Sequence, residues 1–449
     1  KSLILVDQEL GVETRYRFHE IVRQYSHDKL VESGEEANIR TRHLKYFSQL
    51  AEQAETALRG PAQIEWMARL NIERDNIRTA LVWADKTDVE AGLYISSRLS
   101  RFWEYFDMRE GSRWLSIFLK KPESQFYQRA RAMALYAHLP ILNYLSQVDT
   151  WRSTAQECIE LHRAFEDQSI EVGILLMRAG EISNATQRIE LLQRALKLVQ
   201  SSEDIWQQAK TLHHLGWNYS GGERISYWVQ AITLFRQAGD WRLLADLLSN
   251  TGNFAILNGD FELSQKCLDE AALLNDQLKD RVVKANILYA RTRLATMRGD
   301  YNQARIYSQE QLGITEELGA RMSSLWCRSQ LGYLALREGN LTEAQDIFTE
   351  TAREFFNDKN EIGVVFNLEG AAGLYAAIEK SKLAAQLIGW ADTTREKIND
   401  RRQSLEQADV DKIIATCVAE LGEATFSDAY DDGKKMTMDE AVALALSED

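Results

Sequence analysis

The amino-acid sequence predicts an all-α protein, most of which is a solenoid of helical hairpins. The first observation is a repeat of 40 residues, marked by glycine turns at Gly259, Gly299 and Gly339. The second is that small residues follow these turns at a constant distance, at Ser264, Ala304 and Ala344. Self-similarity at such a period is typical of helical repeat arrays, whose usual role is binding.

The composition is the third observation. The chain has 449 residues, only three of which are proline, and 45% of its residues are hydrophobic. Many Ala, Leu, Glu, Gln and Arg residues with so few helix breakers favour helices throughout. The net charge of −14 argues against direct nucleic-acid binding, which requires a basic face.

The cysteine pattern and the hydropathy favour a cytoplasmic protein. The four cysteines lie far apart in the sequence and form no CxxC pair, so we expect buried, reduced thiols. No apolar run reaches the length of about 18 residues that a membrane span needs, and no signal peptide is visible. The chain begins at Lys1 with an abrupt strand-like run, and we therefore expect it to be part of a longer protein.

The chain divides by pattern into four segments. Residues 1–35 are expected to form two short strands and a helix, as at the end of a winged-helix domain. Residues 36–127 are expected to form a small helical linker bundle. Residues 128–400 hold about seven repeats, and residues 401–449 are expected to supply the closing helices that a solenoid end requires.

Within each repeat, the spacing predicts which residues pack between the two helices. If Gly332 is the packing position of a first helix, then Ala344 and Phe348 lie 12 and 16 residues further on. The same offsets from Gly252 reach Ser264 and Leu268. Small residues are needed where two helices cross closely, and bulky residues fill the next groove.

These features resemble known families. The Gly-Asp turns, the small residue of the second helix and the glycine of the first resemble tetratricopeptide (TPR) repeats of a longer, degenerate kind, which form a right-handed superhelix. The segment Arg15–Leu30 resembles the end of the winged-helix domain of bacterial STAND ATPases, the signal-transducing NTPases related to NB-ARC proteins. The stretches Leu58–Pro61 and Arg74–Leu81 resemble the helical linker of the same proteins, and the tail from Phe426 to Ala441 resembles their C-terminal end.

The resemblance implies a sensor module. In the family, an NTPase core that binds ATP or ADP lies upstream in the same chain, and an effector precedes it. The repeat array receives the signal and controls the NTPase. The effector lies outside this sequence, so transcriptional control and a defence role both remain open.

His19 is the one residue to which the resemblance assigns a nucleotide role. Phe18-His19-Glu20 stands at the position of the family's MHD motif, whose histidine contacts the β-phosphate of ADP. An imidazole can donate a hydrogen bond to a phosphate oxygen. The alternative is an ordinary histidine at the start of a helix.

The sequence predicts no enzyme, and no cofactor or metal for this chain. It contains no GxxxxGK[ST] phosphate loop, no HExxH and no GxSxG motif. His213 and His214 are adjacent, so on a helix they point about 100° apart and cannot easily share a metal ion.

The concave groove of the array is the candidate binding site. In TPR-like arrays the first helix of each repeat lines the groove, and the groove-facing offsets select a set that is aromatic and hydrogen-bonding. Its members are His213, Trp217, Ser249, Asn253, Tyr289, Arg293, Trp326, Ser329 and Tyr333. Rings supply contact area, while Asn253 and Arg293 could fix a carboxylate or a backbone, which suits a peptide, a protein or a small-molecule inducer.

Two readings of this groove compete with a sensor. Several of the rings could simply pack between repeats. The array could also be a constitutive protein–protein interaction scaffold without a nucleotide switch. The sensor predicts that a groove ligand raises ATP turnover of the intact protein, whereas the scaffold predicts no nucleotide dependence.

Overall fold

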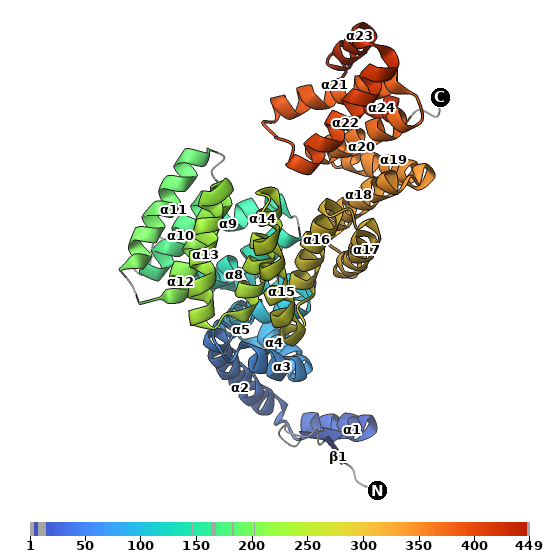
Figure 1. Ribbon diagram of the computed structural model, residues 1–449. Coiled ribbons are helices and arrows are strands. Elements are labelled where there is room, and N and C mark those ends of the chain that lie inside the picture. Colours follow the sequence, from blue (N-terminus) through green and yellow to red (C-terminus); the bar gives the residue numbers. More distant parts are fainter. Residues whose placement is uncertain are drawn as a thin grey trace. The chain divides into compact units, whose positions relative to one another are not determined.

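The computed structural model describes residues 4–7, 15–145, 147–162, 168–181, 184–201 and 203–446. The chain divides into two compact units. The first comprises residues 1–58, 65–142 and 149–165, and the second comprises residues 59–64, 143–148 and 166–449. Apart from one two-stranded hairpin, the elements of the described part are helices (Figure 1).

The first unit begins with an antiparallel hairpin in which Ile4 pairs with Phe18 and Asp7 with Arg15. The predicted strands and the helix after them are therefore confirmed. The apolar side chains of that helix are not buried, since Ile21 and Tyr25 are largely exposed. The elements are β1 Ile4–Asp7, β2 Arg15–Phe18, α1 Glu20–Glu32, α2 Glu36–Ala57, α3 Gln63–Ile72, α4 Arg74–Thr87, α5 Val89–Arg98, α6 Ser100–Phe106, α7 Met108–Leu119, η1 Pro122–Phe126, α8 Gln128–Tyr144 and α9 Val148–His162.

The core of the first unit lies between α2, α4, α5, α6 and α7, where Phe102, Trp103 and Phe118 are fully buried. The helices approach closely at glycine: a Cβ atom on Gly92 would lie 2.0 Å from the Phe118 ring. Ser112 and His138 form a buried hydrogen-bonded pair, with 2.8 Å between Oγ and Nε2. Burial lowers the pKa of His138 to about 4, so this imidazole is neutral at physiological pH.

The second unit is a succession of helices in which each helix from α10 to α22 packs on the next along the chain (Figure 1). The prediction of an all-α fold with a TPR-like array is confirmed. The helices are α10 Gln168–Glu181, α11 Ala185–Gln200, α12 Ile205–Asn218, α13 Gly221–Ala238, α14 Trp241–Leu257, α15 Phe261–Leu278, α16 Arg281–Met297, α17 Tyr301–Leu318, α18 Arg321–Glu338, α19 Leu341–Asn357, α20 Glu361–Ala377, α21 Ser381–Lys397, α22 Ser404–Leu421, α23 Glu423–Gly433 and α24 Met438–Ala445.

The turns explain the 40-residue repeat. Gly259, Gly299 and Gly339 all have φ between 74° and 79°, a left-handed conformation that glycine adopts without strain. Each precedes an Asp or Asn whose side chain caps the following helix. Glu379 keeps the same conformation with φ of 63°. A second series of left-handed turns lies midway between the first, and sequence analysis missed it. Its residues with positive φ are Gly239, Lys279, Gly319, Lys359 and Asn399.

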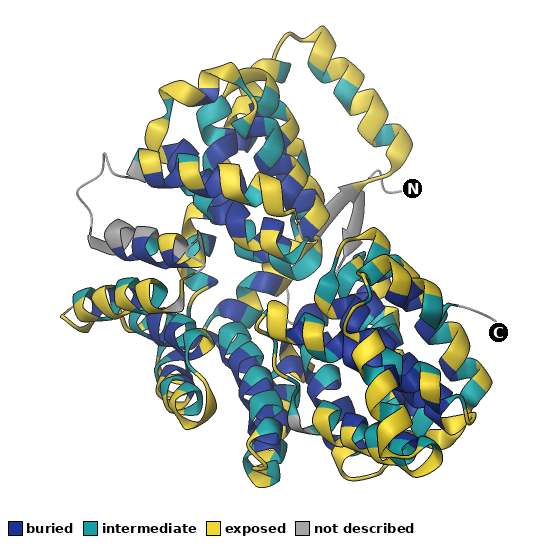
Figure 2. Ribbon diagram, turned by 90° about the horizontal axis from the view of Figure 1, so that it is seen from above, coloured by how far each residue is buried: buried dark blue, intermediate teal, exposed yellow. Residues whose placement is uncertain are grey.

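The predicted packing residues are buried between helices. Ser264, Ala304, Ala344 and Ala384 have no exposed surface. A Cβ atom on Gly252 would lie 2.8 Å from Leu268, and one on Gly332 would lie 2.8 Å from Phe348. Figure 2 shows the result, with buried residues on the helix faces that meet and exposed residues on the outward faces.

The array ends in a closing group of helices, α22 to α24, packed on α20 and α21. Helices α21 and α23 touch at the backbone: a Cβ atom on Gly389 would lie 2.1 Å from the carbonyl oxygen of Tyr430, and one on Gly433 would lie 1.9 Å from that of Gln386. Glycine is required where main chains approach this closely. The predicted boundaries at residues 35, 127 and 400, and the winged-helix character of the first segment, stay predictions.

Candidate functional site

A pocket of about 430 Å³ lies among the later helices of the array. Side chains of α16, α18 and α20 form most of the pocket walls, and Gln311 of α17 also lines it. Residues between positions 400 and 409 line the pocket from the C-terminal part of the chain. We call residues 400–409, which run from the loop after α21 into the first turns of α22, the closing segment. A cavity of this size is in the range of small-ligand sites.

One wall of the pocket is aromatic. Trp326 and Tyr333 of α18 pack against Phe366 of α20, with ring centroids 5.4 Å and 4.6 Å from that of Phe366. The Tyr333 hydroxyl donates to the carbonyl oxygen of Phe366 at 2.6 Å. Burial raises the pKa of Tyr333 well above its usual value, so the phenol remains protonated and holds the two helices together.

Two arginines of the array bind the closing segment. Arg293 of α16 donates to the Oδ1 atom of Asn253 at 2.9 Å and to the Oε1 atom of Gln403. Arg337 of α18 pairs with Asp409 of α22. The two pairs connect residues 110 and 72 positions apart in the sequence, and they place the closing segment over the C-terminal side of the pocket.

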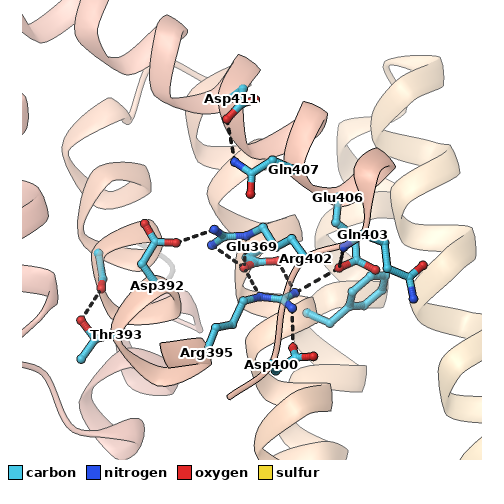
Figure 3. Close-up of polar contacts among 12 residues, drawn as sticks. Glu369, Asp392, Thr393, Arg395, Asp400, Arg402, Gln403, Glu406, Gln407 and Asp411 are labelled. Carbon is cyan, nitrogen blue, oxygen red and sulfur yellow. Dashed lines mark hydrogen bonds and ion pairs between the residues drawn. The ribbon is translucent and has the colours of Figure 1, made fainter. Parts of the chain in front are cut away.

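A buried network anchors the closing segment from the other side (Figure 3). At its centre, the Glu369 carboxylate is 1% exposed and accepts two bonds of 2.8 Å from Arg395 and one of 2.8 Å from Arg402. Arg395 also contacts Asp400 at 2.5 Å and Glu406 at 3.4 Å. Because each of these charges is paired, the network tolerates burial and fixes the loop from Asp400 to Gln403.

Burial changes the protonation of the acids beside the pocket. It raises the pKa of Glu406 and that of Asp409, although Arg395 and Arg337 respectively oppose the shift. Glu406 also accepts the backbone N–H of Gln403 at 3.3 Å and so caps α22.

Four of the nine residues predicted for the groove line the pocket, namely Tyr289, Arg293, Trp326 and Tyr333. Asn253 lies one repeat away and contacts the pocket only through Arg293. Ser249 and Ser329 are fully buried, and their hydroxyls donate to the backbone carbonyls of Asp246 and Leu325. Whether these residues bind a ligand stays a proposal.

His213 and Trp217 lie elsewhere, in an aromatic cluster of α12, α13 and α14. Trp217 donates from Nε1 to the Nε2 atom of His213 at 3.0 Å, and its ring is 5.1 Å from that of Trp228 and 5.8 Å from that of Phe254. Burial lowers the pKa of His213. These rings pack on one another between repeats, and whether His213 and Trp217 also contact a ligand stays a prediction.

Other residues of the pocket escaped sequence analysis. Phe366 follows Trp326 by one 40-residue period, so the repeat itself could have found it. Gln311 and Gln330 carried no such signal. The closing segment lies beyond the last repeat, and only the tertiary structure brings it to the groove.

His19 is exposed at the N-terminus of α1, and its side chain forms no capping hydrogen bond.

Across the part of the chain that the structure describes, no three His, Cys, Asp or Glu side chains are arranged to hold a metal ion. None of the described helices is both long and apolar enough for a membrane span.

Comparisons with known proteins give distant relatives. No protein-family model matches the sequence. Proteins named "Putative HTH-type transcriptional regulator" from Mycobacterium bovis and Mycobacterium tuberculosis are 26% identical over 356 residues, which is 79% of this chain. The chain spans about a third (32%) of the length of these curated relatives.

Two solved structures of helical proteins are similar at low sequence identity. A Rap protein complexed with Competence and Sporulation Factor has a TM-score of 0.47 at 12% identity, over 74% of this chain and 96% of the other. Yeast Tom70 has a TM-score of 0.24 at 15% identity, over 89% of this chain and 91% of the other.

Proposed function

We propose that this chain is the sensor of a larger regulator of the STAND type, in which a ligand in the pocket controls an upstream NTPase and effector. The observation that carries the proposal is the pocket itself. Arginines and aromatic rings line the pocket, and the closing segment bounds it. Arg293 and Arg337 of the pocket walls hold the closing segment with hydrogen bonds. A ligand that enters the pocket competes directly with those bonds, which is what coupling between binding and conformation requires.

Three further observations support the proposal. The distant relatives are named as transcriptional regulators and are about two and a half times as long, which leaves room for other domains. The exposed apolar residues of α1 suit a helix that packs on a neighbouring domain in the longer protein. The four cysteines are buried, and none forms a disulfide within the described structure, which suits the cytoplasm.

The test uses the intact protein with its upstream region. We expect Arg293→Glu to abolish ligand-stimulated ATP turnover, because the new carboxylate reverses the charge at the pocket. The control is Arg353→Glu on the exposed face of α19, which makes the same change in charge away from the pocket. Equal stimulation in both variants would remove the pocket from the signalling path. A protein whose turnover responds to no ligand would be the constitutive scaffold.

For His19 we propose contact with the β-phosphate of ADP in the intact protein, which would stabilise the inactive state. His19→Ala should then raise basal ATP turnover and speed ADP release. His27→Ala is the control, since His27 is a second histidine on the same helix. An unchanged ADP release rate would leave His19 as an ordinary residue at a helix start.

A further inference from the structure

The charges around the pocket are not balanced. Each of the three acids that line it already has an arginine: Asp400 and Glu406 contact Arg395, and Asp409 contacts Arg337. Two further arginines of the lining, Arg293 and Arg401, have no ion pair among the residues that the structure describes. Four arginines and three carboxylates line the pocket, so the lining has an excess of one positive charge, although Arg395 also pairs with Glu369 outside it.

Arg293 is the more telling of the two because it is buried, with 8% of its surface exposed. Its hydrogen-bond partners are the neutral amide oxygens of Asn253 and Gln403, although its charge also acts to lower the pKa of Glu406. A buried guanidinium is better stabilised by a carboxylate, which accepts shorter and stronger hydrogen bonds than an amide. Gln403 thus occupies the place where an anion would bind more tightly.

The pocket also contains acceptors that lack donors. The Oε1 atoms of Gln311 and Gln330 are buried, and neither has a hydrogen-bond partner within the described structure. Gln311 as a whole is 6% exposed. Buried amide oxygens are normally paired, so both atoms favour a ligand with N–H groups. An amide group of a ligand can donate its N–H to the glutamine oxygen and accept a hydrogen bond from the glutamine NH2 group.

The aromatic wall completes the description of the ligand. Trp326 and Phe366 offer apolar surface on one side, and Tyr289 lies beside Arg293, whose guanidinium carbon is 5.7 Å from the tyrosine ring centroid. Apolar walls with a few placed polar groups are typical of sites that bind small organic molecules. The ligand needs an acid, N–H donors and an apolar body.

We propose that the pocket binds a small carboxylic acid that also carries N–H donors, an N-acyl amino acid or short peptide with a free terminal carboxylate, and that this carboxylate displaces Gln403 from Arg293. The assignment rests on the proposed function and names its ligand class. Arg401, which is exposed at the pocket, guides and holds the acid from the solvent side.

Displacement of Gln403 gives binding a structural consequence. The bond between Arg293 and Gln403 is the direct link from α16 to the closing segment, whereas Arg337–Asp409 links it to α18. Ligand binding removes the first link and leaves the second. The Gln403 side chain is then released at the start of α22, while Arg395 and Arg337 still hold Glu406 and Asp409, and this local change is a defined signal for a neighbouring domain.

The test is affinity selection with two matched probe libraries on the full 449-residue chain. Both contain all N-acetylated tripeptides of the common amino acids; one has free carboxylates and the other has terminal amides. We expect the chain to retain acids and to lose at least about tenfold in affinity for the corresponding amides, as befits one charge-assisted hydrogen bond. Retention of amides alone, equal retention of both forms, or no retention of either would overturn the ligand class.

Variants of single residues locate the site. Arg401→Ala should weaken the selected acid about tenfold and its amide little, while Arg353→Ala, an exposed arginine outside the pocket, should change neither. Gln403→Ala should tighten binding of the acid several-fold, because it removes the side chain that competes for Arg293. Gln403→Glu should prevent binding of the acid, because the new carboxylate of the protein pairs with Arg293 itself. Thermal unfolding of each variant checks that the fold is intact.

The outcomes separate this inference from the proposed function. If acids bind but Gln403→Ala does not tighten them, the competition with the closing segment is wrong. If amides bind and stimulate ATP turnover of the intact protein, the pocket is a sensor for a different ligand class. If acids bind tightly without affecting turnover in the intact protein, the ligand class holds and the sensor function fails.

Discussion

The two parts of the array use equivalent positions of the repeat differently. In the front part, α12 to α15, the inner side chains are large rings: Trp217 and His213 pack on Trp228. In the rear part, α16 to α20, a pocket remains, because Arg293 and Arg337 extend toward the closing segment and not toward each other. The backbone repeat alone therefore does not create a site. A site forms where polar side chains find their partners on a later segment.

The largest expected effect tests whether the closing segment depends on Glu369. Glu369→Ala leaves Arg395 and Arg402 buried without their shared carboxylate, so we expect the free energy of unfolding to fall by about 3–5 kcal/mol. Chemical denaturation gives the magnitude. Hydrogen exchange should become faster in residues 400–409 and stay unchanged in α12 to α14.

The matched control for that variant is Glu354→Ala. Glu354 also contacts two arginines, Arg321 and Arg328, but its side chain is 30% exposed. Exposed ion pairs contribute about 0–1 kcal/mol, so this change should be small. Similar losses in the two variants would mean that the buried network has no special role.

The front part should be sensitive to overpacking at Gly216. A Cβ atom there would lie 2.1 Å from the Trp228 Nε1 atom, so Gly216→Ala should cost about 1–3 kcal/mol of unfolding free energy. Gly313→Ala is the control, because nothing lies within 4 Å of its Cβ position and alanine favours the helix by up to about 1 kcal/mol. Denaturation of the two variants should give opposite signs; a stable Gly216→Ala protein would show that the cluster is loosely packed.

The two parts should respond to pH in opposite directions. Burial lowers the pKa of His214 from 6.5 to about 3, so between these values the unfolded chain takes up a proton that the folded chain refuses. His214 thus stabilises the fold above pH 6.5, and about 2 kcal/mol should be lost from the front part on lowering the pH from 7 to 5. Glu406 and Asp409 have raised pKa values, so their contribution is complete below their ordinary pKa and is lost as the pH rises.

Hydrogen exchange at pH 7 and pH 5, corrected for intrinsic rates, checks this contrast. Protection should fall in α12 to α14 and hold or rise in residues 400–409. His214→Gln should reduce the loss in the front part, because glutamine does not titrate, whereas His213, whose pKa burial also lowers, remains. Loss of protection that is uniform along the array would contradict separate responses.

The smallest expected effect tests whether the binding site extends into the front part. Trp217 is 45% exposed, and Trp217→Ala should cost only about 1 kcal/mol of stability. Binding of a tripeptide acid selected by the pocket should be unchanged. Weaker binding in this variant, measured by titration calorimetry, would extend the site along the groove to α12.

The candidate site could be predicted in part. Tyr289, Arg293, Trp326 and Tyr333 follow from the repeat because helical periodicity fixes which face of α16 and α18 is inward. Ser249 and Ser329 share that register but are buried, since neighbouring helices cover small side chains more readily than large ones. His213 and Trp217 lie outside the pocket because aromatic rings of adjacent repeats are large enough to pack on one another, and a binding role for them stays a prediction.

The sequence by itself determined the helices, their 40-residue period and the small residues at their crossings. All three are local properties, set by left-handed turns such as Gly259 and by packing between neighbouring helices. Only the tertiary structure decided where the pocket lies, because it depends on contacts such as Arg293 with Gln403. Such a contact joins residues 110 positions apart, and no periodicity specifies it.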